Sequence, residues 1–139
     1  MRAVTLAVPS LLLCLGLSRA PSPAGTWKGT WDSPDGSVYS AAMTLTANGD
    51  SIDGSIIWTL AQATRPDLKP KVGQHGTEFV RGVYHVDCRV VQMAGYRLDD
   101  PSHILGMDHY DLILAPNGAG LGGVTDNGGT WTGMISLRR

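Results

Sequence analysis

The sequence predicts an all-β protein, a single eight-stranded antiparallel up-and-down β-barrel that follows a signal peptide. Apolar and polar residues alternate at period two along most of the chain, as they do in strands with one buried face. The 139 residues include 18 glycines and one glutamate, a composition that disfavours helices. Turn signals separate the alternating segments at intervals of roughly 8–12 residues, which is typical of a sandwich or a barrel.

The segment 1–24 has the layout of a secretory signal peptide. A basic start precedes an apolar stretch that is too short to span a bilayer, and small residues follow. Ser22 and Ala24 suit positions −3 and −1 of a cleavage site, so cleavage is expected before Gly25, leaving one barrel domain over 25–139. We therefore expect a secreted protein, periplasmic or extracellular, with no membrane attachment after cleavage.

The clearest strand pair flanks Asn48-Gly49, a strong signal for a two-residue type I′ hairpin turn, in which both central residues have φ > 0. On each side of the turn, every second residue is mainly apolar. These residues are Tyr39, Ala41, Met43 and Leu45 before the turn, and Ile52, Gly54, Ile56, Trp58 and Leu60 after it. The pattern predicts that these residues share the buried face of a hairpin.

Six more strands are expected, at about 26–32, 77–86, 88–98, 110–114, 121–125 and 131–138. Residues 61–76 contain two prolines and no periodic pattern of apolar residues, so we expect one long loop there. The other connections are short, and the first and last strands share a Gly-Thr-Trp unit that includes Trp27 and Trp131. Both features favour a barrel that closes by pairing its end strands, which removes exposed edges.

Charge and motifs exclude several function classes. The net charge is −1, and it becomes −3 once Arg2 and Arg19 leave with the leader, so nucleic-acid binding is not expected. The histidines show no metal-ligand spacing and no nucleophile elbow occurs, so we assign no metal, cofactor or catalytic residue. Cys14 leaves with the leader, and Cys88, expected in or beside a strand as a small buried residue, then has no disulfide partner.

One loop region groups side chains that could perform acid–base chemistry. It combines two histidines with three nearby carboxylates, namely His103, His109, Asp99, Asp100 and Asp108. A carboxylate beside an imidazole is the minimum for a general base. A hydrolase that uses this His/Asp loop is therefore kept as a second alternative function.

Residues 29–37, Gly-Thr-Trp-Asp-Ser-Pro-Asp-Gly-Ser, resemble the opening of avidin-type proteins, and lipocalins share the Gly-x-Trp element. Ser37 matches the avidin pattern, whereas Ser33 stands where avidins have Asn. Both families are calycins, eight-stranded barrels that hold a small ligand in the barrel mouth, and the resemblance implies the same here. It also implies that Arg138 or Arg139 stacks over Trp31, which would then close one end of the barrel.

Tryptophan and tyrosine dominate the aromatic residues on the expected strands, and their polar atoms suit a pocket that is partly wet. The expected ligand-binding residues are Trp31, Ser33, Ser37, Tyr39, Trp58, Tyr84, Tyr96 and Tyr110. The function expected first is non-enzymatic binding of a small, partly apolar ligand in the barrel mouth. The first alternative is a secreted module that binds or inhibits an extracellular protein through loops 61–76 and 99–108.

Overall fold

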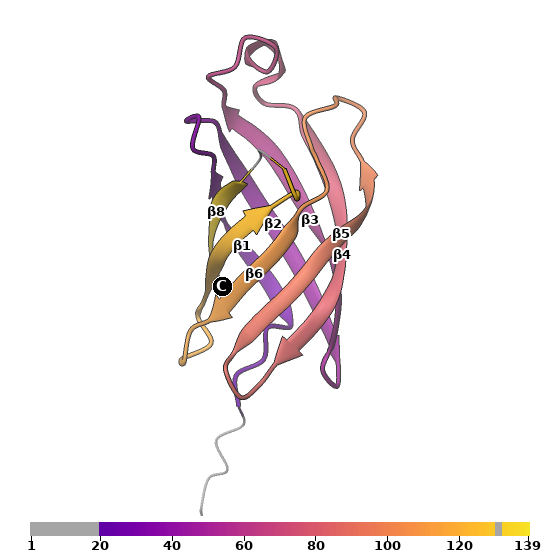
Figure 1. Cartoon of the computed structure of the whole chain (residues 1–139), viewed down its shortest axis with the longest axis vertical. Helices are drawn as coiled ribbons and strands as arrows, with labels where there is room; N and C mark the ends of the chain where they lie inside the picture. Colours follow the sequence, from indigo (N-terminus) through magenta and orange to yellow (C-terminus); the bar gives the residue numbers. More distant parts are fainter. Residues whose placement is uncertain (1–19, 130–131) are drawn as a thin grey trace, which may run out of the picture.

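Eight strands form a closed antiparallel barrel in the computed structural model, which describes residues 20–129 and 132–139 (Figure 1). The strands are β1 (Gly25–Asp32), β2 (Val38–Asn48), β3 (Ser51–Gln62), β4 (His75–His85), β5 (Val90–Asp99), β6 (His109–Leu114), β7 (Gly120–Asp126) and β8 (Thr132–Arg138). Each strand pairs with the next one, and β1 also pairs with β8. The predicted fold class is confirmed. No helix in the described ranges has the length and apolar character needed to cross a membrane.

The alternation seen in the sequence places the core inside the barrel. Tyr39, Met43 and Leu45 of β2 are almost fully buried, and so are Ile56 and Leu60 of β3. The residues between them mostly face solvent or are partly covered, because successive side chains of a strand point to opposite faces. The predicted buried face of this hairpin is therefore confirmed.

Two local expectations are wrong. Asn48 pairs with Ser51, so the hairpin loop is Gly49-Asp50, and of its two residues only Gly49 has a positive φ, at 60°. This is the pattern of a type II′ turn, in which glycine takes the first central position. Cys88 is exposed in the turn that precedes β5, because that strand begins two residues later than expected.

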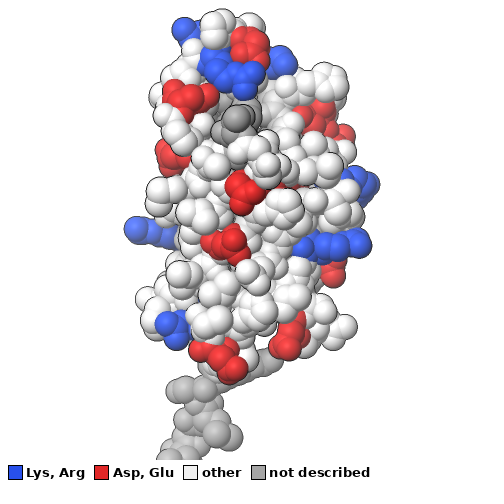
Figure 2. Space-filling view, in the orientation of Figure 1, with Lys and Arg blue, Asp and Glu red and all other residues white. Residues whose placement is uncertain are grey.

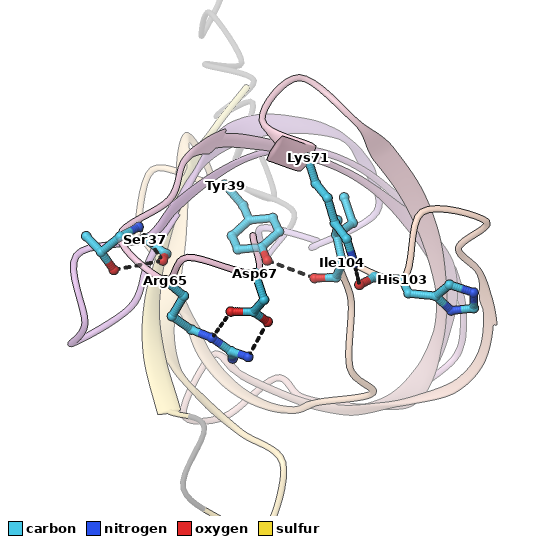
Figure 3. A network of polar contacts seen from close by, with 8 residues as sticks. Ser37, Tyr39, Arg65, Asp67, Lys71, His103 and Ile104 are labelled. Carbon is cyan, nitrogen blue, oxygen red and sulfur yellow. Dashed lines mark hydrogen bonds and ion pairs between the residues drawn. The ribbon is translucent and has the colours of Figure 1, made fainter. Parts of the chain in front are cut away.

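Two connections cover one end of the barrel, which we call the mouth; it lies at the top in Figure 1. The β3–β4 connection, expected as a long loop over 61–76, contains the short 3₁₀ helix η1 (Lys69–Lys71). It buries Leu68, and the β5–β6 connection buries Ile104. The carbonyl of Ile104 accepts a hydrogen bond from the Tyr39 hydroxyl at 2.8 Å, and Lys71 Nζ donates to the carbonyl of His103 at 3.0 Å (Figure 3). The two connections are thus joined to each other and to the barrel.

The opposite end is closed by Trp27, which is fully buried. The Arg139 guanidinium carbon lies 4.4 Å from the centre of the Trp27 ring. The resemblance placed this stacking on Trp31, and that expectation is wrong, because β1 runs toward the mouth and carries Trp31 there. Two Gly-Thr-Trp units four residues apart put both indoles on one face of the strand, roughly 13 Å apart along it.

The segment just before β1 packs against this opposite end. The Trp27 indole N–H donates to the carbonyl of Pro23 at 2.8 Å, and the Tyr84 hydroxyl donates to that of Pro21 at 2.9 Å. Arg139 donates to the carbonyls of Ser22 and Ala24, the latter at 3.0 Å. Most of the expected signal peptide, 1–19, lies outside the described residues, as does Trp131. Pro21 to Ala24, the last four residues of that expected leader, contact the barrel.

Candidate functional site

A cavity opens at the mouth of the barrel. It contains about 370 Å³ of space that no protein atom fills, a volume that includes the part continuous with solvent. Its walls come from four strands, β1 to β4, and from the β5–β6 and β7–β8 connections. The lining residues are Trp31, Tyr39, Trp58, Glu78, Ile104, Leu105, Gly106, Asp108 and Asn127.

Three aromatic rings form one side of this cavity, and we call Trp31, Tyr39 and Trp58 the aromatic wall. The rings of Trp31 and Tyr39 have centroids 5.6 Å apart at 74°, and those of Tyr39 and Trp58 are 6.3 Å apart at 84°. These edge-to-face contacts are a favourable arrangement of aromatic rings. The Trp31 indole N–H also donates to the Thr125 hydroxyl at 2.7 Å. Gly133 makes room for this indole, because a β-carbon there would lie 2.2 Å from Trp31 Cε2. Packing and hydrogen bonding therefore fix the aromatic wall.

Glu78, the chain's one glutamate, is buried inside the barrel and is 1% exposed. Its Oε2 accepts hydrogen bonds from the Trp58 indole N–H at 3.1 Å and the Tyr110 hydroxyl at 2.5 Å. Its Oε1 accepts a bond from the backbone N–H of Asp108 at 3.0 Å. Burial raises the pKa of Glu78 above its usual value, and these three donors offset part of the rise. The donors match a carboxylate, since an ionised carboxyl group only accepts hydrogen bonds.

Asp108 brings a second carboxyl group to the cavity from the residue just before β6. Within the part of the chain that the structure describes, its side chain has no hydrogen-bond partner. Burial raises the pKa of Asp108 to about 7, and the negative charges of Glu78 and Asp126 add to the rise. No described lining residue is a lysine or an arginine. The cavity therefore combines two acidic groups without a basic one among those residues.

Three of the eight sequence-predicted site residues, Trp31, Tyr39 and Trp58, meet in this cavity. Tyr110 reaches the site indirectly, through its hydrogen bond to Glu78. Tyr84 lies at the opposite end of the barrel, where it bonds to the backbone of the segment before β1.

The other three predicted residues lie elsewhere. Tyr96 is exposed, and the Arg81 guanidinium lies 3.8 Å from its ring centre. Ser33 and Ser37 belong to the β1–β2 connection, and Ser37 is buried, with its hydroxyl 3.4 Å from that of Thr64. None of these three residues lines the cavity.

The His/Asp loop separates into different environments. His103 is exposed, and the Nδ1 atom of the exposed His109 lies 3.9 Å from Asp126 Oδ1, a residue that does not line the cavity. Asp100 organises the loop instead, because its Oδ2 accepts the backbone N–H groups of Ile104 and Leu105, each at 2.8 Å. Asp108 lines the cavity, whereas none of the described histidines does. No group of three potential metal ligands occurs among the described residues.

The sequence reasoning missed Glu78 as a site residue, although a signal for it exists. Glu78 has the same strand parity as the buried Gly76 and Val80, so it falls on the inward face of β4. A lone glutamate at an inward position of a barrel strand is unusual, because burying a charge is costly unless it is hydrogen-bonded. Asn127 and the segment 104–106 have no such signal, because connections between strands lack the alternation of apolar and polar residues that assigns a side chain to one face.

The chain matches no protein-family model, no curated protein and no solved structure. What the cavity offers a ligand follows from its chemistry. The aromatic wall provides apolar contact area, and the carboxyl group of Asp108 provides a polar partner. Such a combination can hold and orient a small molecule that has an apolar body and a polar group.

Proposed function

We propose that this protein is a secreted, non-enzymatic, calycin-like barrel that binds a small, partly apolar molecule in the cavity at its mouth. The observation that carries the proposal is the cavity itself, in which fixed aromatic rings face a small number of polar groups. Concave sites with this composition are typical of small-molecule binding. The leader-like sequence 1–24 supports secretion, and the barrel with its Gly-x-Trp element supports a calycin-like assignment.

Binding is favoured over hydrolysis because the histidines of the loop region are not part of the cavity lining. A general base built from an imidazole and a carboxylate would need both groups at the reacting atom. Asp108 and Glu78 share the cavity, but three donors already occupy the Glu78 oxygens. These contacts suit a group that shapes the site and sets its charge.

The proposal is tested by calorimetric titration of the full chain with a panel of small amphipathic compounds of positive, negative and zero charge. We expect saturable one-to-one binding of at least one compound. Trp58→Phe should weaken that binding, because it shrinks the aromatic wall and removes a donor to Glu78.

Trp27→Phe is the matched control, since it also removes an indole N–H bond, but at the opposite end of the barrel. We expect it to leave the affinity unchanged. Absence of any saturable binder, or a binder whose affinity responds equally to both substitutions, would contradict a ligand site in the mouth cavity.

A further inference from the structure

We propose that the ligand of the mouth cavity carries a protonated amine, held by the carboxylate of Asp108 against the aromatic wall. This inference rests on the proposed ligand-binding function and adds the charge class of the ligand. Two independent features of the cavity, its unbalanced charge and the aromatic wall along one side, favour the same type of ligand.

The first feature is the charge of the cavity. Glu78 has its hydrogen bonds satisfied by the protein, whereas the described residues provide no partner for the Asp108 carboxylate. Arg65, above the mouth, forms two bonds with Asp67, at 2.7 and 3.1 Å, and does not line the cavity (Figure 3). A carboxylate in a partly buried site gains most from a partner that is both positively charged and a hydrogen-bond donor. An ammonium group meets both conditions.

The second feature is the set of aromatic faces. Because neighbouring rings of the aromatic wall meet at 74° and 84°, they present differently oriented faces and edges around one space. Cations are attracted to ring faces within about 6 Å, most strongly to tryptophan, and the attraction grows as water is excluded. Aromatic cages beside a carboxylate therefore favour ammonium over a neutral group of the same shape.

The charges on the surrounding surface indicate that a preference for cations would come from the cavity itself. On the face of the molecule shown in Figure 2, acidic and basic side chains are interspersed rather than gathered by sign. A broad field would attract cations to many surface positions, whereas two carboxyl groups within one cavity act at short range. Selection for charge should consequently depend on Asp108 and not on the net charge of the chain.

The competing hypothesis is that Asp108 is protonated and binds an uncharged ligand. Because burial and the charges of Glu78 and Asp126 raise the pKa of Asp108 to about 7, its neutral form is also present near pH 7. A neutral Asp108 would donate a hydrogen bond to an alcohol or carbonyl of an uncharged ligand. A comparison of ligands with the same body and different charge separates the two cases.

The test is calorimetric titration of the full chain, at about pH 8 so that Asp108 is ionised, with phenethylammonium, phenethyl alcohol and phenylacetate. We expect the ammonium compound to bind at least about tenfold more tightly than the alcohol, and phenylacetate to bind most weakly. Asp108→Asn should weaken binding of the ammonium compound by roughly tenfold to a hundredfold, the usual contribution of a hydrogen bond to a charged group. The same variant should leave the affinity for the alcohol nearly unchanged.

Asp111→Asn is the matched control, because Asp111 is exposed, contacts Gln92 on the outside of the barrel and carries the same charge. It should not alter the preference for the ammonium compound. If the alcohol or phenylacetate binds as tightly as the ammonium compound, the amine inference is wrong while the ligand-binding function stands. If none of these compounds binds but another in the wider panel does, the charge of that binder decides the inference, and a panel without any binder overturns both proposals.

Discussion

The carboxylate of Glu78 occupies space that a glycine at position 95 leaves open. A β-carbon on Gly95 would come within 2.0 Å of Oε1 of Glu78. Gly95 pairs with Val80 across β4 and β5, next to a register shift between Phe79 and Val80. Real β-carbons do not approach an oxygen so closely, so this glycine on the neighbouring strand allows Glu78 to point into the barrel.

Gly95→Ala should therefore destabilise the protein. The added methyl group must displace the buried carboxylate or the backbone, and overpacking of this kind costs typically about 1–3 kcal/mol. Urea unfolding followed by fluorescence measures the change in the free energy of unfolding. Gly106→Ala is the control, because a β-carbon there meets nothing within 4 Å, and we expect a change near zero. Equal effects at both positions would show that Glu78 can move aside freely.

Tyr110→Phe should destabilise the folded chain by about 1–3 kcal/mol, because it removes a donor from a buried carboxylate. The hydrogen bond from Tyr110 also lowers the pKa of Glu78, so its loss should raise that pKa further. Chemical denaturation of the variant, with Tyr96→Phe as the exposed control, measures the energetic effect. Similar stabilities of the two variants would argue that the bond between Tyr110 and Glu78 contributes little.

Asp108 should make the ligand-free protein less stable as the pH rises. The pKa of Asp108 is about 7 in the folded chain, whereas its ordinary value, which applies to the unfolded chain, is 3.8. Between these two pH values the folded state therefore holds a proton that the unfolded state has released. Stability from this group is therefore greatest below about pH 4 and is lost as the pH rises through about 7. Glu78 acts in the same direction, because its pKa is also raised.

The measurement is the thermal unfolding midpoint of the wild-type chain and of Asp108→Asn between about pH 5 and pH 8. The variant should lose less stability over this interval, since one of the titrating groups is gone. Asp111→Asn should retain the wild-type slope. A variant Asp108→Asn with the full wild-type slope would mean that Asp108 titrates at its ordinary pKa.

The segment before β1 should contribute to stability. A chain that begins at Gly25 lacks the carbonyls of Pro21 and Pro23 that accept bonds from Tyr84 and Trp27. We expect it to be less stable than a chain that begins at Ala20, by about 1–3 kcal/mol for the lost bonds together. Urea unfolding of the two chains tests this, and equal stability would mean that these contacts are weak. The intact mass of exported protein then shows whether the mature chain begins at Gly25 or earlier.

The sequence by itself determined the strands, the buried faces and the barrel. The alternation from Tyr39 to Leu45 and from Ile52 to Leu60 is a local property, because each side chain's face follows from its position in an extended backbone. Turn residues between the segments mark the ends of strands for an equally local reason. Trp31, Tyr39 and Trp58 were identified as candidate ligand contacts because they are aromatic residues on such strands.

Only the tertiary structure decided which of these residues share one site. Period two assigns Trp27 and Trp31 to the same face, but the direction of β1 within the closed barrel places one at each end. Tyr110 meets Glu78 across 32 residues of sequence, and the contact depends on the register of strands that are not neighbours in the sheet. The carboxylate cluster beside the aromatic wall therefore arises from the stagger of the strands and the path of their connections, which are set by packing around the whole barrel.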